Sequence, residues 1–169
     1  MSEGVVLDTD WAVFAHRLPT PGEGRPLELF TAYGRYEVVA HPLVADYNDA
    51  MLLHLAVLAE LRLTLGVAAW RWTVLQDEAV DYAGGKPDAV YVPAANALCA
   101  AEVDLGFYSL ERVRKKLKAF TRYQNSVWGV ISSRRAAYLQ RVASELGLPP
   151  PQVRVLPLPG KSLLTAQAV

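Results

Sequence analysis

The order of helical and extended segments after residue 43 constrains the fold of this chain more than any other feature of its sequence. Residues 44–66 are rich in Leu and Ala and end in a glycine, which indicates a long, largely buried helix. Three short apolar runs follow, then an amphipathic helix that begins near Tyr108, a buried strand, a second amphipathic helix and a last strand. The expected strands are 68–75, 89–92, 97–103, 127–132 and 153–158, and the expected last helix is 133–146. This order predicts an α/β fold, a mixed sheet flanked by helices, with antiparallel strands first and a parallel pair near the end.

The first 43 residues have a different pattern. Two runs rich in Val, Phe, Tyr and Trp, at 5–18 and 27–41, flank the turn-forming segment PTPGEGRP, which predicts strands joined by a loop. We therefore expect three parts along the chain. They are an N-terminal β-rich extension at 1–43, an α/β core at 44–160 and a flexible tail at 161–169.

Composition excludes several classes of protein. With 169 residues, 52% of them hydrophobic and 20% charged, the chain suits a folded globular domain rather than a disordered or fibrous one. Its single cysteine, Cys99, excludes a disulfide framework and any CxxC zinc or redox site. The N-terminus carries acidic residues where a signal peptide needs basic ones, and charged residues interrupt the most apolar stretch, 50–70. We expect a cytoplasmic protein that does not partner a membrane.

The net charge of zero conceals an uneven distribution of charge. Residues 1–106 hold 6 Lys and Arg against 15 Asp and Glu, whereas residues 107–141 hold 9 Lys and Arg against the single acid Glu111. Few salt bridges between neighbouring helix turns are therefore available, and such a density of positive charge is typical of surfaces that bind a phosphate backbone. The expected nucleic-acid contacts are Arg112, Arg114, Lys115, Lys118, Arg122, Arg134, Arg135 and Arg141, and charge alone does not distinguish DNA from RNA.

Acidic residues occur at chemically suggestive places in the core. Asp88 begins the second expected strand and Glu102 lies near the end of the third, so their carboxylates can converge at one end of a sheet and offer Mg²⁺ the oxygen ligands that it prefers. Glu102 follows the apolar run ALCAA, where an unpaired carboxylate is costly, so a partner cation is expected. Simpler interpretations stay open: Asp88 as a turn residue, Asp104 as the start of a loop, and Glu60 as a solvated position on its helix.

The order of these motifs resembles the core of the PD-(D/E)xK nuclease superfamily. More narrowly, the chain resembles the replication-relaxation family, which is associated with plasmid replication and DNA relaxation. The similarity covers roughly residues 50–132 and rests on four segments. They are HLAVLAELR at 54–62, PDA at 87–89, AEVD at 101–104, and KL at 116–117 with Phe120.

The resemblance implies a restriction-endonuclease-like fold and a metal-dependent site that cleaves phosphodiesters. The implied Mg²⁺ ligands are Asp88, Glu102 and Asp104. Glu60 would assist through a water molecule, and Lys116 would orient the attacking water or the phosphate. Active members typically carry a lysine where this chain has Asp104, so Lys116 in the following helix is the expected substitute.

Three functional hypotheses follow. The first is a DNA-binding or DNA-processing protein in plasmid replication or mobilisation, with Mg²⁺-dependent endonuclease activity left open. The second keeps the nuclease-like fold and the DNA contacts without cleavage. The third is a protein-interaction module that forms a homodimer, in which the acidic part of one copy meets the basic part of another.

Overall fold

The structure is a computed structural model that describes residues 5–7, 25–40, 46–75, 85–93, 97–156 and 158. These residues belong to two compact units. The N-terminal unit comprises residues 2–70 together with 157–169, and the C-terminal unit comprises residues 71–156. The predicted tail, 161–169, lies outside the described residues. Within the described parts of the chain, every helix is too short or too polar to cross a membrane.

The N-terminal unit contains a small antiparallel sheet and one long helix. The strands β1 (Val5–Leu7), β3 (Gly34–Ala40) and β2 (Arg25–Thr31) lie in that order, and α1 (Asp49–Thr64) packs against the sheet. The segment 27–41, expected as one extended run, is thus a hairpin that turns tightly after Thr31. Gly34 allows this turn because its φ of 133° is strained for any other residue.

The long buried helix expected at 44–66 is confirmed in its type and position. The Asn48 side chain accepts a hydrogen bond from the backbone N–H of Met51 and caps the start of α1. Gly66, with a φ of 63°, follows its end. The Asp49 carboxylate accepts a hydrogen bond of 2.8 Å from the backbone N–H of Phe30, which ties the first turn of α1 to β2.

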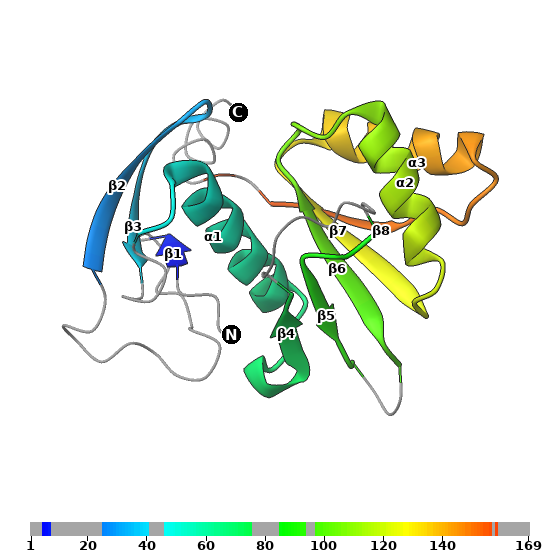
Figure 1. Ribbon diagram of the computed structural model, residues 1–169, viewed down its shortest axis with the longest axis horizontal. Helices are drawn as coiled ribbons and strands as arrows, with labels where there is room; N and C mark the ends of the chain where they lie inside the picture. Colours follow the sequence, from blue (N-terminus) through cyan, green and yellow to red (C-terminus); the bar gives the residue numbers. More distant parts are fainter. Residues whose placement is uncertain are drawn as a thin grey trace, which may run out of the picture. The chain divides into compact units, whose positions relative to one another are not determined.

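The C-terminal unit is a five-stranded mixed sheet flanked by helices, as predicted (Figure 1). Its first three strands are antiparallel and its last three are parallel. The sheet order is β4 (Trp72–Val74), β5 (Ala89–Tyr91), β6 (Cys99–Asp104), β7 (Asn125–Val130) and β8 (Gln152–Val155). The expected strand 68–75 is shorter than predicted, because residues 69–71 form a turn of 3₁₀ helix.

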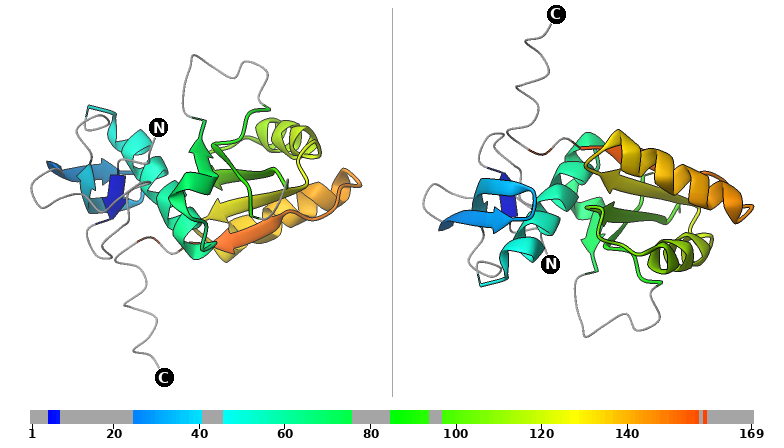
Figure 2. Two further views of the ribbon diagram at one scale, coloured as in Figure 1. Left: turned by 90° about the horizontal axis from the view of Figure 1, so that it is seen from below. Right: turned by 90° about the horizontal axis from the view of Figure 1, so that it is seen from above.

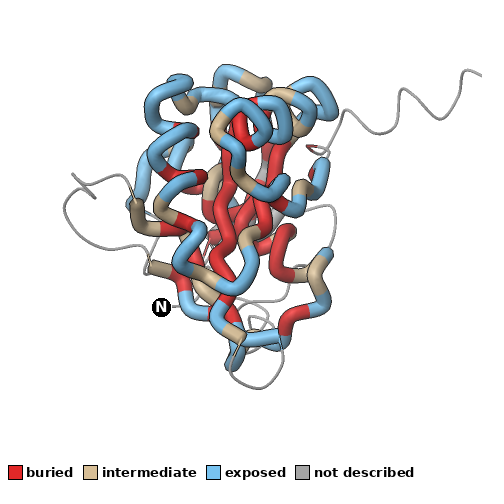
Figure 3. The backbone as a smooth tube through the Cα atoms, turned by 90° about the vertical axis from the view of Figure 1, so that its right-hand side faces the viewer, coloured by how far each residue is buried: buried red, intermediate tan, exposed pale blue. Residues whose placement is uncertain are grey.

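Each of the two parallel connections contains a helix. α2 (Leu110–Phe120) joins β6 to β7, and α3 (Ser133–Glu145) joins β7 to β8. The two helices lie side by side on the same face of the sheet (Figure 2). Buried positions are concentrated in the strands beneath these helices (Figure 3).

The core beneath these helices explains where the site forms. Apolar side chains of α2 and α3 pack on Ala100, Trp128 and Val130 of the sheet. Because side chains alternate between the two faces of a strand, Glu102 and Asp104 share the helix-facing side of β6 with Ala100. Two carboxylates therefore lie beneath a helical layer, and both residues have no exposed surface.

Candidate functional site

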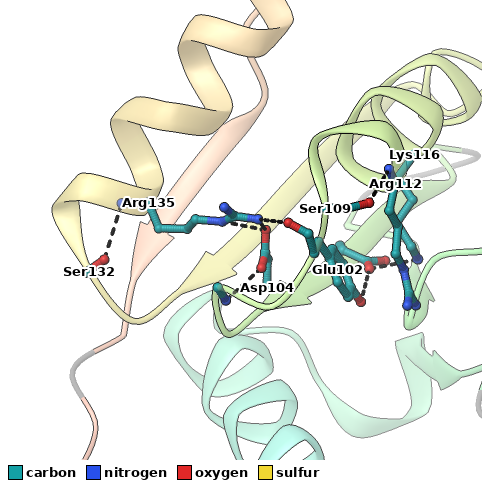
Figure 4. A network of polar contacts seen from close by, with 9 residues as sticks. Glu102, Asp104, Ser109, Arg112, Lys116, Ser132 and Arg135 are labelled. Carbon is teal, nitrogen blue, oxygen red and sulfur yellow. Dashed lines mark hydrogen bonds and ion pairs between the residues drawn. The ribbon is translucent and has the colours of Figure 1, made fainter. Parts of the chain in front are cut away.

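Glu102 is the centre of a fully enclosed polar network. Its carboxylate oxygen Oε1 lies 2.7 Å from the Lys116 Nζ and accepts a hydrogen bond of 2.7 Å from the Tyr108 hydroxyl. The second oxygen, Oε2, accepts a hydrogen bond of 3.2 Å from the backbone N–H of Asp88. Lys116, itself only 4% exposed, reaches this carboxylate from α2 (Figure 4). Both oxygens of Glu102 are therefore engaged by groups of the chain itself.

Asp88 joins this network across the β5–β6 pair. Its Oδ2 accepts a hydrogen bond of 2.7 Å from the backbone N–H of Val103, while its own N–H bonds to Glu102. The Lys116 Nζ also donates a hydrogen bond of 2.8 Å to the carbonyl oxygen of Lys86. The site thus brings together Asp88, Glu102 and Lys116, three of the four residues to which catalytic roles were assigned.

The environment shifts the proton affinity of this network. Burial, and then the negative charge of Asp88, raise the pKa of Glu102 to about 8, although Lys116 and Tyr108 act in the opposite direction. Burial and the two carboxylates also raise the pKa of the Tyr108 hydroxyl, so it keeps its proton and continues to donate. Glu102 accordingly changes its charge close to neutral pH.

Asp104 belongs to a second network. Its Oδ2 lies 2.8 Å from Nε and 2.7 Å from Nη2 of Arg135, and its Oδ1 accepts a hydrogen bond of 2.8 Å from the backbone N–H of Gly106. Arg135 reaches it from the first turn of α3 and also donates to the carbonyl oxygen of Tyr108, at 2.9 Å (Figure 4). Arg135, predicted as a DNA contact, is thus largely an internal partner of a buried carboxylate, with 16% of its side chain exposed.

The carboxylates do not form a set of ligands ready for Mg²⁺. Among the residues that the structure describes, no three His, Cys, Asp or Glu side chains gather in a way that could hold a metal ion. Both oxygens of Glu102 accept hydrogen bonds from the chain, and Asp104 is bound to Arg135 and Gly106. Glu60 lies half-buried on α1, in the other compact unit. A hard cation would therefore have to displace existing partners of Glu102 and Asp104.

The remaining predicted DNA contacts have exposed side chains on or just after α2 and on α3. The exposed basic residues are Arg112, Arg114, Lys115, Lys118, Arg122, Arg134 and Arg141, and we call them the basic face. Two ion pairs link this face internally: Glu145 lies 3.4 Å from Arg114 and 3.7 Å from Arg141. Because α2 and α3 cover the same side of the sheet, these side chains belong to one layer of the C-terminal unit.

Sequence reasoning missed Tyr108 and the connection that contains it. Tyr108 links the two networks, since its hydroxyl binds Glu102 and its carbonyl oxygen accepts from Arg135. Gly106 was the available signal in the sequence, because glycine favours turns, and its φ of 97° in the structure shows that it forms one here.

Comparison of the chain with models of known families, with curated proteins and with solved structures finds no match. The function is therefore argued from the residues and their geometry.

Proposed function

We propose that this protein binds DNA through the basic face of α2 and α3, without cleaving it. The observation that carries the proposal is the division of the basic residues in 107–141. Lys116 and Arg135 turn inward to the buried carboxylates, whereas the other seven have exposed side chains in one helical layer. A dense layer of cations suits the regularly spaced charges of a phosphate backbone.

The arrangement of the strands supports a restriction-endonuclease-like fold for this domain. Three antiparallel strands, β4 to β6, precede a helical crossover to the parallel strand β7, the order that the resemblance to the PD-(D/E)xK superfamily implies. Asp88 directly precedes β5 and Glu102 lies in the neighbouring strand β6, where that resemblance expects its two acidic motifs. The resemblance to the replication-relaxation family favours plasmid replication or mobilisation as the setting of DNA binding.

The state of Glu102 favours binding over cleavage. A carboxylate that holds a metal ion for phosphodiester chemistry needs free lone pairs and access to the phosphate. Glu102 has no exposed surface, and its two oxygens are occupied by the Lys116 ammonium, the Tyr108 hydroxyl and the backbone N–H of Asp88. The contact between Glu102 and Lys116 accordingly serves as an internal link between β6 and α2.

Titration of a fluorescein-labelled DNA duplex, followed by anisotropy at several salt concentrations, tests the binding. Affinity should fall steeply between about 50 and 200 mM salt, and Lys118→Ala or Arg134→Ala should each reduce the slope of log K against log salt by about 1. Arg35→Ala is the matched control, because Arg35 is an exposed arginine of the N-terminal unit. Binding that does not respond to Lys118→Ala and Arg134→Ala would refute the assignment of the surface.

Cleavage and self-association are tested in the same preparation. The convergence of Asp88, Glu102 and Lys116 makes Mg²⁺-dependent cleavage the second candidate, so supercoiled plasmid should be incubated with the protein and Mg²⁺. Nicking that Glu102→Gln abolishes would overturn the non-cleaving assignment. Sedimentation at low and high salt should show the same mass, whereas a salt-sensitive dimer with no affinity for DNA would favour the interaction module.

A further inference from the structure

The connection between β6 and α2 presents an aromatic side chain to solvent. Phe107 is 67% exposed, although its neighbours Leu105 and Tyr108 are buried and half-buried. Single exposed apolar side chains are common on protein surfaces, and Phe30 is equally exposed, so the surroundings of Phe107 decide whether it marks a contact surface. The question is which partner would cover it.

The backbone on both sides of Phe107 is held in place by side chains from the sheet and α3. Before it, the Gly106 N–H donates to Asp104, and the φ of 97° at Gly106 sets the turn. After it, the carbonyl oxygen of Tyr108 accepts from Arg135. The Tyr108 hydroxyl is fixed in turn by Glu102. Phe107 therefore projects from an ordered turn, and a partner would not have to meet the entropic cost of ordering it.

Positive charge begins directly after Phe107 in the chain. The Arg112 guanidinium, which belongs to the basic face, lies 4.2 Å from the centre of the ring of Tyr108, the residue that follows Phe107. The nearby carboxylates of Glu102 and Asp104 are enclosed and paired with Lys116 and Arg135. An exposed aromatic ring on the connection that leads into α2 and its exposed cations suits a ligand that combines phosphates with flat apolar rings, as single-stranded DNA does.

We infer that Phe107 stacks on an unpaired nucleobase, and that the DNA ligand therefore includes a single-stranded segment. This inference rests on the proposed function and specifies its ligand. The basic face would hold the phosphates, and Phe107 would cover the face of one base. Bases inside a duplex are already stacked on their neighbours, so the ring has such a partner only where the strand is unpaired or opened.

Anisotropy with a fluorescein-labelled single strand and with its duplex tests this inference through three variants. Phe107→Leu keeps an apolar side chain without a ring and should bind the single strand about tenfold more weakly. Phe107→Trp keeps the ring and should bind like the wild type. Phe30→Leu is the matched control, since Phe30 on β2 is also 67% exposed, and it should leave binding unchanged.

A base analogue gives a readout that a purely structural role would not move. The emission of 2-aminopurine in the single strand should change on binding to the wild type and to Phe107→Trp, and much less with Phe107→Leu. Circular dichroism and the unfolding midpoint of each variant should match the wild type, because the altered side chain is exposed.

Two outcomes would overturn the inference. If Phe107→Leu binds the single strand like the wild type while Lys118→Ala and Arg134→Ala weaken binding, stacking is refuted and the basic face stands. If Phe107→Leu weakens single strand and duplex equally, the ring does not select unpaired bases. Failure of the basic-face variants to change any binding would instead refute the proposed function itself.

Discussion

Replacing Glu102 by glutamine should remove a large part of the pH dependence of this protein's stability. Burial and the charge of Asp88 raise the pKa of Glu102 from an ordinary value of 4.5 to about 8. The folded state therefore binds this proton more tightly than the unfolded chain does. It follows that the contribution of Glu102 to the free energy of unfolding decreases as the pH rises above about 4.5, and that the decrease levels off above about pH 8.

The size of the effect follows from the two pKa values. Between them, the free energy of unfolding changes by up to about 1.4 kcal/mol for each pH unit. Glu102 should thus lower the stability of the wild type by about 2–3 kcal/mol between about pH 5 and pH 7, and by about 1–1.5 kcal/mol more between about pH 7 and pH 9. Glutamine is neutral throughout and lacks this contribution.

Urea unfolding of wild type and Glu102→Gln at pH values from about 5 to 9 measures this difference. Other titrating groups are common to both proteins, so they cancel when the two free energies are subtracted. The free energy of unfolding of Glu102→Gln should increase steadily, relative to that of the wild type, up to about pH 8. Glu145→Gln is the control, because the Glu145 side chain is 47% exposed, and its difference from the wild type should stay nearly flat. A difference for Glu102→Gln that is constant over the whole range would refute the buried, shifted carboxylate.

Three further changes probe the same unit by urea unfolding. Lys116→Met should cost about 1–2 kcal/mol near pH 6, where the lost bond to the Lys86 carbonyl dominates, and more above pH 8, by up to about 1.4 kcal/mol for each further pH unit, because ionised Glu102 has lost its cation; equal costs at both pH values would contradict the coupling. Gly106→Ala should cost about 1–3 kcal/mol because its φ is 97°, and a neutral result would show that the turn relaxes. Leu139→Ala, at a position with no exposed surface, should cost about 2–5 kcal/mol, and a loss below about 1 kcal/mol would mean that the core under α3 is loosely packed.

Strong periodicity made the helices and the sheet class of the C-terminal unit predictable. Val113, Leu117 and Phe120 recur at helical spacing, and all three are buried against the sheet. Leu110, assigned to the same apolar stripe, is 41% exposed because it occupies the first position of α2, at the edge of the layer.

Short extended segments were less predictable, because local pattern does not decide where a strand begins. Residues 68–75 alternate as a strand would, yet Trp70 lies in a 3₁₀ turn and is 74% exposed, whereas Trp72 begins β4 and is buried. The run 27–41 lacks a strong turn signal, and only Gly34 marks the hairpin within it. Pairing with β5 decides where β4 begins, and a tight turn between two strands that pair with each other divides the run 27–41; local periodicity registers neither.

For the site, the sequence predicted that a buried carboxylate at Glu102 requires a cation, but not which cation. Lys116 pairs with it because α2 packs over β6 in one register, and that register depends on the whole core. A lysine from the chain and a bound metal ion meet the same electrostatic need, so burial alone does not distinguish them.

The two acidic residues of β6 account for only two of the basic residues that follow them in the chain. The exposed residues of the basic face therefore need another explanation. Glu102 and Asp104 face the helical layer two positions apart, and leaving either charge unpaired would cost several kcal/mol. α2 meets this need with Lys116 and α3 with Arg135, which accounts for two of the nine basic residues in 107–141. The other seven have exposed side chains that these buried acids do not require. Glu145 pairs with only two of them, Arg114 and Arg141, and mutual repulsion among the exposed cations is unfavourable for folding, which supports the polyanionic partner that we propose.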